Sequence, residues 1–600
     1  MTWSKEKDVK GHAILSHLDV SDLYVLERNA PPEFSLAATL DPAKDNAGNA
    51  STSSGGNLPK LRTGKWFGGP PLIVYDLNKD GLSEVILAGA NLIYWNKGNH
   101  VYENDRLLAN YPGRLASAMI VDLNKDGRPD LFCVPDAGYP SVYLGTADGK
   151  FAAEPIESRV GTEPLIESAN CTAGDVDGDG DIDIFVTQYK NPYELGQMPT
   201  PFYDANDGFP SFILLNDGKG RFVDGTEKAG LLAKRNRRTY SSSFVDLDGD
   251  GDLDLLVVSD FSGMDVYFND GKGKFEDRTA MLGGDRHSFG MSHAIADFNG
   301  DGKLDIYMAG MGSTTARRLE KMGIGKAGGE EMTAKRMPMG YGNRLFLGGE
   351  KGELKQAAYN DVVSRSGWAW GTTAWDFDND GDRDLYIANG NMSRKTAKDY
   401  CTTYWRHDIY TGSSKQSPAL DLFFGTCHQN FNEISWNPFE HKVLFMNEGG
   451  GKFLNVAYLF GLGQEYDSRS LVGDDLDGDG RVDLILNERS WNPETGNTTQ
   501  KMQIYKNGLQ SGNNWIGVRL SDDQPGASPI GATVFVKSGG RVDLLPVITG
   551  DSFSAQHSLS KHFGLGKATE VDSIEVRWPD GRISRRGKPH LNQYHILKPD

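Results

Sequence analysis

The sequence of 600 residues predicts an all-β protein, a seven-bladed β-propeller followed by a small C-terminal β domain. The main indication is a nine-residue loop of the form Asp-x-Asp/Asn-x-Asp-Gly-x-x-Asp/Glu, which occurs seven times and is followed each time by an apolar strand. The loops begin at Asp76, Asp122, Asp175, Asp246, Asp297, Asp376 and Asp475. Their intervals of 46, 53, 71, 51, 79 and 99 residues suit one four-stranded blade per repeat, with insertions in the longer ones.

Each loop offers the ligands of a hard cation. Positions 1, 3, 5 and 9 carry side-chain oxygens, position 7 can add its backbone carbonyl, and glycine at position 6 permits the sharp turn. So many close carboxylates would repel one another strongly without a cation. Calcium is the best candidate, because it accepts six to eight oxygens in flexible geometry whereas magnesium requires a tight octahedron. The sequence therefore predicts calcium loops that hold up to seven Ca2+ ions.

The predicted metal ligands are five residues per loop, of which the fourth contributes only its backbone carbonyl. They are Asp76, Asn78, Asp80, Leu82 and Glu84; Asp122, Asn124, Asp126, Arg128 and Asp130; Asp175, Asp177, Asp179, Asp181 and Asp183; Asp246, Asp248, Asp250, Asp252 and Asp254; Asp297, Asn299, Asp301, Lys303 and Asp305; Asp376, Asp378, Asp380, Asp382 and Asp384; and Asp475, Asp477, Asp479, Arg481 and Asp483.

Two other architectures that use such loops are excluded. An EF-hand needs flanking helices and a glutamate at position 12, but here that position is apolar and lies in a strand-like run, as at Val257 and Leu486. Toxin-type nine-residue repeats follow one another without a gap, and these loops do not.

Hairpin signals complete each repeat. The segments 216–222 and 269–275 both read Asn-Asp-Gly-Lys-Gly-x-Phe, and 447–453 is similar. Asn/Asp-Gly between apolar residues is a strong hairpin signal. An unclosed β-solenoid would need shorter and more uniform repeats, so a closed ring is favoured. We expect residues 33–40 to supply the strand that closes it.

The repeat of acidic loop and hairpin resembles the FG-GAP/VCBS repeat, which also builds the integrin α-subunit propeller. The tail carries Asn-Trp-Ile-Gly-Val-Arg-Leu at 514–520, His-Phe-Gly-Leu-Gly at 562–566 and Val-Arg-Trp-Pro-Asp-Gly at 576–581. This order resembles the ASPIC/UnbV domain that follows such propellers in proteins similar to cartilage acidic protein. The resemblance implies calcium binding and, for most relatives, secretion without an assigned reaction.

Three regions are predicted. Residues 1–60 form an N-terminal helix, with apolar positions such as Ile14 and Leu18, and a Ser/Gly/Asn-rich linker. Residues 61–512 form the propeller, and residues 513–600 form the ASPIC/UnbV-like domain.

Composition restricts the function. Lys and Arg number 63 against 82 Asp and Glu, a net charge of −19, and 25 of the carboxylates stand at ligand positions of the loops. Without a basic stripe, nucleic acid is an unsuitable partner. No apolar run approaches the length of a membrane span. Calcium sites of this kind fill where calcium is plentiful, so we expect an extracellular or periplasmic protein, although no signal peptide is visible at the start.

An insertion in the sixth repeat, residues 389–441, is the candidate site. Aromatic rings mixed with charges line sugar-binding clefts and enzyme pockets. The catalytic candidates are His407, Asp408, Arg406 and Tyr404, and the ligand-binding candidates are Trp405, Tyr400, Trp436 and His428. The alternative is that these residues form a satellite core. Cys401 and Cys427 lie in the same insertion and could be bridged.

A second insertion, residues 310–340, is rich in methionine and is interpreted as a helical excursion packed with adaptable methionines; the alternative is a methionine-rich surface for a metal or a hydrophobic partner. The chain contains no nucleophile elbow, P-loop, dinucleotide glycine motif or His-Glu-x-x-His zinc motif. Two functions therefore remain open. One is a calcium-binding extracellular recognition protein that binds glycan or protein through insertions on a propeller face. The other is a polysaccharide-active lyase or hydrolase with its site in residues 389–441.

Overall fold

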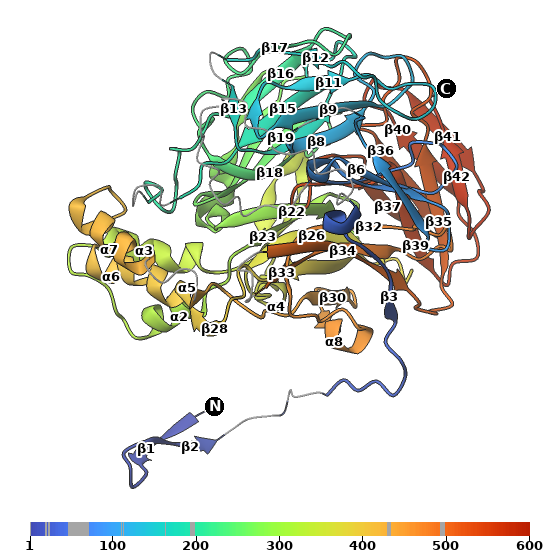
Figure 1. Cartoon of the computed structure of the whole chain (residues 1–600). Coiled ribbons are helices and arrows are strands. Elements are labelled where there is room, and N and C mark those ends of the chain that lie inside the picture. Colours follow the sequence, from blue (N-terminus) through green and yellow to red (C-terminus); the bar gives the residue numbers. More distant parts are fainter. Residues whose placement is uncertain are drawn as a thin grey trace.

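The computed structural model describes residues 2–17, 21, 25–45, 71–109, 111, 113–161, 164–192, 198–428, 434–492 and 498–599. Seven sheets, each with four antiparallel strands of the repeats, form a ring (Figure 1). Their innermost strands contact one another in the order β4, β8, β14, β18, β22, β26, β32 and back to β4. The predicted propeller is thus confirmed.

The strands of the first four sheets are short and largely buried. They are β4 (Leu72–Tyr75), β5 (Glu84–Leu87), β6 (Leu92–Asn96) and β7 (Tyr102–Arg106); β8 (Leu115–Val121), β9 (Asp130–Pro135), β11 (Ser141–Tyr143) and β12 (Ile156–Glu157); β14 (Ser168–Gly174), β15 (Asp183–Gln188), β16 (Phe212–Asn216) and β17 (Phe222–Asp224); and β18 (Arg238–Val245), β19 (Asp254–Asp260), β20 (Gly263–Asn269) and β21 (Phe275–Asp277).

The other three sheets have the same order. Their strands are β22 (Gly290–Ala296), β23 (Asp305–Gly310), β24 (Arg344–Gly348) and β25 (Leu354–Gln356); β26 (Ala369–Trp375), β27 (Asp384–Asn389), β30 (Val443–Asn447) and β31 (Phe453–Asn455); and β32 (Asp467–Asp474), β33 (Asp483–Trp491), β34 (Thr498–Asn507) and β3 (Phe34–Leu40). The strand β3 pairs antiparallel with β34, so the expected closing strand is confirmed and the propeller begins before residue 61.

Every acidic loop joins the innermost strand of a sheet to the second strand. The fourth loop, for example, leaves β18 at Val245 and enters β19 at Asp254. Because the innermost strands follow one another around the ring in the same sense, all seven loops lie at one end of it, which we call the acidic face. The two insertions follow second strands, β23 and β27, and therefore lie at the opposite end, which we call the insertion face.

The prediction of an N-terminal helix is wrong for the described part of residues 1–32; residues 18–20 and 22–24 of that prediction lie outside it. Residues 2–17 form a hairpin of β1 (Thr2–Lys7) and β2 (Ala13–His17). Its turn explains the error: the Asp8 carboxylate accepts backbone N–H bonds from Lys10 and His12, both 2.8 Å long, and Gly11 has a φ of 82°. This local turn chemistry outweighs the apolar spacing that suggested a helix. Residues 46–60 of the predicted linker lie outside the described residues.

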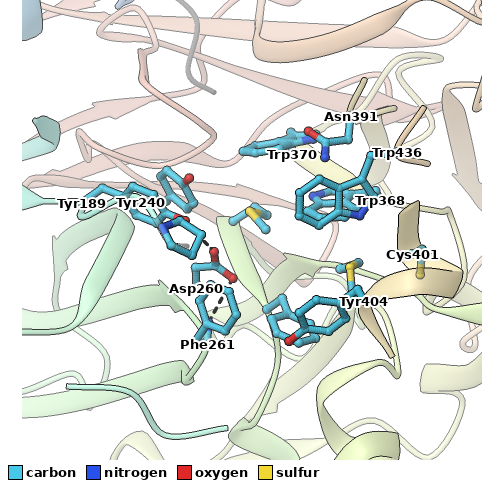
Figure 2. A pocket seen from close by; sticks show the side chains of 14 residues that line it. Tyr189, Tyr240, Asp260, Phe261, Trp368, Trp370, Asn391, Cys401, Tyr404 and Trp436 are labelled. Atoms are coloured by element: carbon cyan, nitrogen blue, oxygen red, sulfur yellow. Dashed lines mark hydrogen bonds between the residues drawn. The ribbon is translucent and has the colours of Figure 1, made fainter. Parts of the chain in front are cut away.

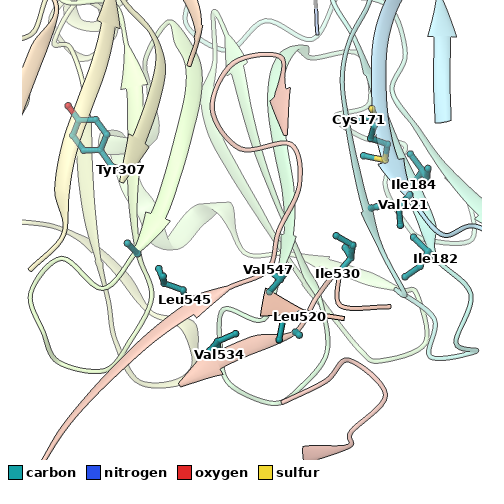
Figure 3. Close-up of a cluster of buried hydrophobic side chains, with 14 of the residues drawn as sticks. Val121, Cys171, Ile182, Ile184, Tyr307, Leu520, Ile530, Val534, Leu545 and Val547 are labelled. Carbon is teal, nitrogen blue, oxygen red and sulfur yellow. The ribbon is translucent and has the colours of Figure 1, made fainter. Parts of the chain in front are cut away.

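The C-terminal domain consists of two sheets beside the acidic face (Figure 1). One contains β39 (Ser560–Gly566), β35 (Asn514–Leu520) and β42 (Tyr594–Leu597); the other contains β37 (Arg541–Pro546), β36 (Thr533–Ser538), β40 (Ser573–Arg577) and β41 (Ile583–Gly587). Figure 3 shows that Ile530, Val534 and Val547 of this domain share one buried cluster with Val121 and Ile184 of the propeller. The two domains are therefore packed through a common core.

Residues 547–558 of the C-terminal domain, here called the channel segment, run through the centre of the ring. The carbonyl of Thr549 accepts bonds from Thr172 of β14 and Ser243 of β18, 2.9 and 2.8 Å long. The amide of Ser552 donates to a carbonyl of β22, and β38 (Ala555–Gln556) pairs with β4. These contacts satisfy the polar groups of the innermost strands.

Helices cover the insertion face (Figure 1). The fifth-repeat insertion forms α2 (Thr314–Lys321) and α3 (Glu330–Met339), as the expected helical excursion, and the sixth forms α5 (Tyr400–Tyr404), α6 (Arg406–Tyr410) and α7 (Pro418–His428). Smaller elements are α1 (Pro42–Asp45), α4 (Asn360–Val363), α8 (Ala457–Phe460), and the pairs β10 (Ala137–Gly138) with β13 (Leu165–Ile166) and β28 (Thr396–Asp399) with β29 (Ile434–Ser435). Among the described residues, no helix has the length and apolar character to cross a membrane.

Candidate metal centres and the insertion face

The acidic loops share one hydrogen-bonding pattern. In every loop the position-1 carboxylate accepts a bond of 2.8–3.1 Å from the N–H of the position-6 glycine. These glycines have φ values between 78° and 104°, where a side chain would be strained. In the fourth loop Asp248 also accepts from the amide of Asp250, and Asp250 from that of Asp252. Each of these bonds turns a carboxylate into the loop.

Position 9 is held from both sides. One oxygen of Asp254 accepts the N–H of Leu247 within the loop, at 3.0 Å, and the other accepts the N–H of Asn269 from the third strand, at 2.9 Å. Asp183 is held in the same way, at 3.2 and 2.9 Å. In these two loops the position-9 carboxylate is therefore fixed by a strand of the sheet as well as by the loop itself.

Several loops bring carboxylates close enough to share an ion. Ligand oxygens of three residues lie within 4.8 Å of one another in the third, fourth, sixth and seventh loops. Burial raises the pKa of Glu84, Asp183 and Asp254 to about 8 in each case, so these groups resist ionisation without a compensating charge.

Some buried carboxylate oxygens of the loops have no hydrogen-bond partner among the described residues, and they indicate whether the loops suit a cation. Among the described residues, buried atoms without a hydrogen-bond partner include Glu84 Oε1, Asp177 Oδ1, Asp477 Oδ1 and Asp483 Oδ2, all at ligand positions. A buried carboxylate oxygen without a partner is costly. In the first and third loops, where oxygens alone surround such atoms, the donor set fits a hard divalent cation.

The C-terminal domain contacts the acidic loops directly. Arg519 donates to the carbonyl of Gly81 in the first loop, at 2.6 Å, and His562 Nε2 donates to Asn379 Oδ1 in the sixth, at 2.7 Å. Arg541 donates to the carbonyl of Gly381. The motifs at 514–520 and 562–566 contain Arg519 and His562, but a local motif does not indicate which acidic loop each residue faces, so the sequence did not predict this interface.

The catalytic candidates of the sixth insertion do not converge on an open cleft. Tyr404 and His407 are buried, and His407 Nδ1 donates to the carbonyl of Tyr404. Asp408 is paired with Arg336 at 2.7 Å, and both side chains are 0% exposed. Arg406 is exposed and lies over the ring of Tyr410. Burial lowers the pKa of His407 to about 4, so it is neutral at pH 7.

The aromatic candidates belong to a buried cluster. Trp405, Tyr400 and Trp436 pack with Trp368 and Trp370 from β26 and its preceding turn. Trp368 stacks on Trp370 with centroids 6.1 Å apart, and Trp436 meets Trp368 edge-on at 4.9 Å. The arrangement agrees with a satellite core. His428 is the last residue of α7, and its side chain lies outside the described residues. Of the two cysteines that could be bridged, Cys401 is a free, buried thiol, and the side chain of Cys427 lies outside the described residues.

A small apolar cavity remains in this cluster (Figure 2). It measures about 40 Å³, and its lining includes Trp368, Trp370 and Trp436 together with Tyr189, Tyr240 and Asp260. Asp260 accepts a hydrogen bond from Tyr189, 2.9 Å long, and burial raises its pKa to about 7. A cavity of this size is too small for a sugar ring. The residues that the third and fourth sheets contribute, such as Tyr189 and Tyr240, could not be predicted from the sequence, because they belong to no motif.

Comparisons with known proteins agree with this architecture. A family model for FG-GAP-like repeats matches residues 76–133, 122–186, 205–257 and 246–308, and the model for ASPIC and UnbV matches residues 522–600. Cartilage acidic protein 1 of Xenopus tropicalis is 24% identical over 478 residues, which cover 69% of this chain and 70% of the relative. The Homo sapiens protein of that name is 23% identical over 522 residues, covering 74% and 75%.

Two solved structures are similar at lower identity. The V. cholerae biofilm matrix protein Bap1 is 13% identical with a TM-score of 0.26, and the match covers 70% of this chain but only 59% of Bap1. The exotype rhamnogalacturonan lyase YesX is 12% identical with a TM-score of 0.30, covering 82% and 91%. The propeller of this chain therefore carries FG-GAP-like repeats and its C-terminal region an ASPIC/UnbV domain, and the chain is similar to the cartilage acidic proteins.

Proposed function

We propose that this protein is a calcium-stabilised recognition protein that acts outside the cytosol and binds a glycan or a protein through its insertion face. The observation that carries the proposal is the set of acidic loops, which share one backbone geometry and which, in the first, third and seventh loops, hold buried carboxylate oxygens without partners among the described residues. Calcium suits such oxygen-only loops better than magnesium. Its abundance outside the cytosol supports the proposed location.

The outer surface of the insertion face is the better candidate for recognition, because the inner cluster is closed. Tyr410 is 60% exposed and Leu422 72% exposed, and Arg406 lies over the Tyr410 ring at 5.6 Å. Tyrosine and arginine are enriched among the residues that dominate binding interfaces. Arg406 and Tyr410 lie on α6, which the buried Arg336–Asp408 pair joins to α3.

The experiment compares ligand binding with metal content. The wild type and the double variant Arg406→Ala/Tyr410→Ala are applied to arrays of glycans and of extracellular proteins in calcium buffer. We expect the affinity of the variant for any wild-type ligand to be at least tenfold lower. This corresponds to a loss of about 1.4 kcal/mol or more in binding free energy, which is the scale found for residues that anchor an interface. Its calcium content and melting temperature should stay unchanged.

Tyr458→Ala is the matched control, because Tyr458 is 63% exposed on α8, outside the two insertions. Equal loss of ligand binding in the control, or full binding by the double variant, would mean that the ligand is not recognised by the outer surface of the two insertions.

A further inference from the structure

A histidine stands where the equivalent turns of the propeller have glycine. The hairpin turn between the third and fourth strands has glycine as its fifth residue in the second to sixth sheets, with φ values of 70° to 80° at Gly149, Gly220, Gly273, Gly352 and Gly451. In the first sheet this position is His100, which keeps the left-handed backbone with a φ of 57°. A side chain is uncommon in this conformation, so its presence calls for a reason.

The turn position faces the acidic loop of the preceding sheet. A Cβ built on Gly273 would lie 3.0 Å from Cβ of Asp177, position 3 of the third loop. A Cβ on Gly352 would lie 2.9 Å from Cβ of Asp248, position 3 of the fourth. Around the closed ring, the sheet that precedes the first is the seventh. His100 therefore reaches position 3 of the seventh loop, which is Asp477.

The contacts agree with this placement. His100 Nε2 lies 3.3 Å from Asp477 Oδ2 and 3.7 Å from Asp483 Oδ2. Ligand atoms of His100, Asp477 and Asp483 all lie within 4.8 Å of one another. His100 is only 9% exposed, and neither of its ring nitrogens has a hydrogen-bond partner among the described residues. Asp477 Oδ1 and Asp483 Oδ2 are also buried without partners.

The remaining oxygens of the seventh loop are already engaged by donors from the protein. Lys506 Nζ contacts Asp477 Oδ2 and lies 3.1 Å from Asp479 Oδ2, and Arg481 is also paired with Asp479. Tyr594 donates to Asp475 Oδ2 at 2.9 Å. These contacts weaken the loop as an all-oxygen calcium site. The atoms left over are the two ring nitrogens of His100, of which Nε2 faces the carboxylates, and two carboxylate oxygens, Asp477 Oδ1 and Asp483 Oδ2.

We propose that His100, Asp477 and Asp483 form a site for a divalent transition-metal ion, with Zn2+ as its representative, between the first and seventh sheets. Imidazole nitrogen is a good ligand for zinc, copper, iron and nickel, whereas calcium and magnesium select oxygen. The ion would join the first sheet to the last at the closure of the ring. The site goes beyond the proposed function, because it does not depend on calcium in the other loops.

The test measures metal binding by the full chain. The protein is saturated with calcium at millimolar concentration and titrated with Zn2+ by calorimetry, and with Co2+ by its visible absorption. We expect one ion to bind that excess calcium does not displace. His100→Gly, which restores the residue of the equivalent turns, should weaken Zn2+ binding by at least about tenfold, because altering even a residue that only orients a metal ligand costs about 10- to 100-fold in affinity.

A second variant and a control complete the experiment. His100→Asn tolerates the left-handed backbone and removes the imidazole, so it separates loss of the ligand from any effect of glycine on folding. His12→Ala removes an exposed histidine that lies 3.0 Å from Asp8 and should change nothing. The proposal is overturned if both His100 variants bind Zn2+ like the wild type, or if calcium displaces the ion from the wild type. The calcium count of the same samples reports separately on the proposed function.

Discussion

The hydroxyl of Tyr594 in the C-terminal domain donates a hydrogen bond of 2.9 Å to Asp475, the first residue of the seventh acidic loop. The same domain reaches the first loop through Arg519 and the sixth through His562. The loops thus serve two purposes: they are the candidate metal sites, and they form the surface on which the second domain packs. Loss of metal should therefore affect both domains.

Chelation should lower the melting temperature markedly, and calcium should restore it better than magnesium. An ion that binds only the folded state stabilises it by about 2.7 kcal/mol per site when its free concentration is 100 times the dissociation constant. Differential scanning calorimetry in EDTA, with each ion added back in excess, measures the effect. An unchanged unfolding curve after prolonged dialysis against EDTA would contradict metal binding by the loops.

Replacing Asp250 by alanine should remove one calcium ion and leave the others. Asp250 stands at position 5 of the fourth loop, and each repeat supplies its own side-chain ligands, so the loss should be local. Metal analysis of the purified variant gives the count. Asp252→Ala is the matched control, because position 7 contributes only its backbone carbonyl and the calcium content should not change. Equal metal loss in both variants would disprove the ligand assignment.

Replacing Trp405 by alanine should destabilise the protein rather than remove a ligand selectively. The side chain is 0% exposed and packs edge-on against Phe202 and Phe289 at 6.2 and 5.9 Å. Truncation of a buried tryptophan costs about 3–5 kcal/mol. Chemical denaturation measures the loss, with the exposed Arg406→Ala as the control. A Trp405→Ala/His407→Ala variant of wild-type stability that has lost ligand binding would restore the pocket interpretation.

Acidification should destabilise the protein partly through His293. This residue is buried between Ser241 and Ser243, 2.8 and 2.9 Å from their hydroxyls, and burial lowers its pKa from 6.5 to about 4. Between these values the unfolded state binds more protons than the folded state, so stability is complete above pH 6.5 and is lost as the pH falls. The full effect of one such shift is up to about 3 kcal/mol.

Urea denaturation from pH 7 to pH 4 in calcium buffer tests this prediction. The stability of His293→Gln should fall less steeply with acid than that of the wild type, while the exposed His12→Ala should behave like the wild type. Identical slopes for all three proteins would exclude His293 as a contributor.

The amino-acid sequence alone determined the repeat, the loops and the order of domains. A nine-residue loop carries its ligands and its glycine within one short segment, so the positions from Asp246 to Asp254 could be recognised without any neighbour. The hairpin turns are equally local. The same reliance on local pattern produced the error at the N-terminus, where the turn around Asp8 and Gly11 made a hairpin from residues with helical spacing.

Only the tertiary structure decided what these segments face. Whether Trp405 and His407 line a cleft or a core depends on contacts with residues more than a hundred positions away in the sequence, such as Phe202. The meeting of His100 with Asp477 requires the closed ring, because it joins sheets at the two ends of the chain. The contact of Tyr594 with Asp475 requires a second domain folded onto the acidic face. Burial and the pairing of polar groups are properties of these assembled contacts, and no periodicity within one segment encodes them.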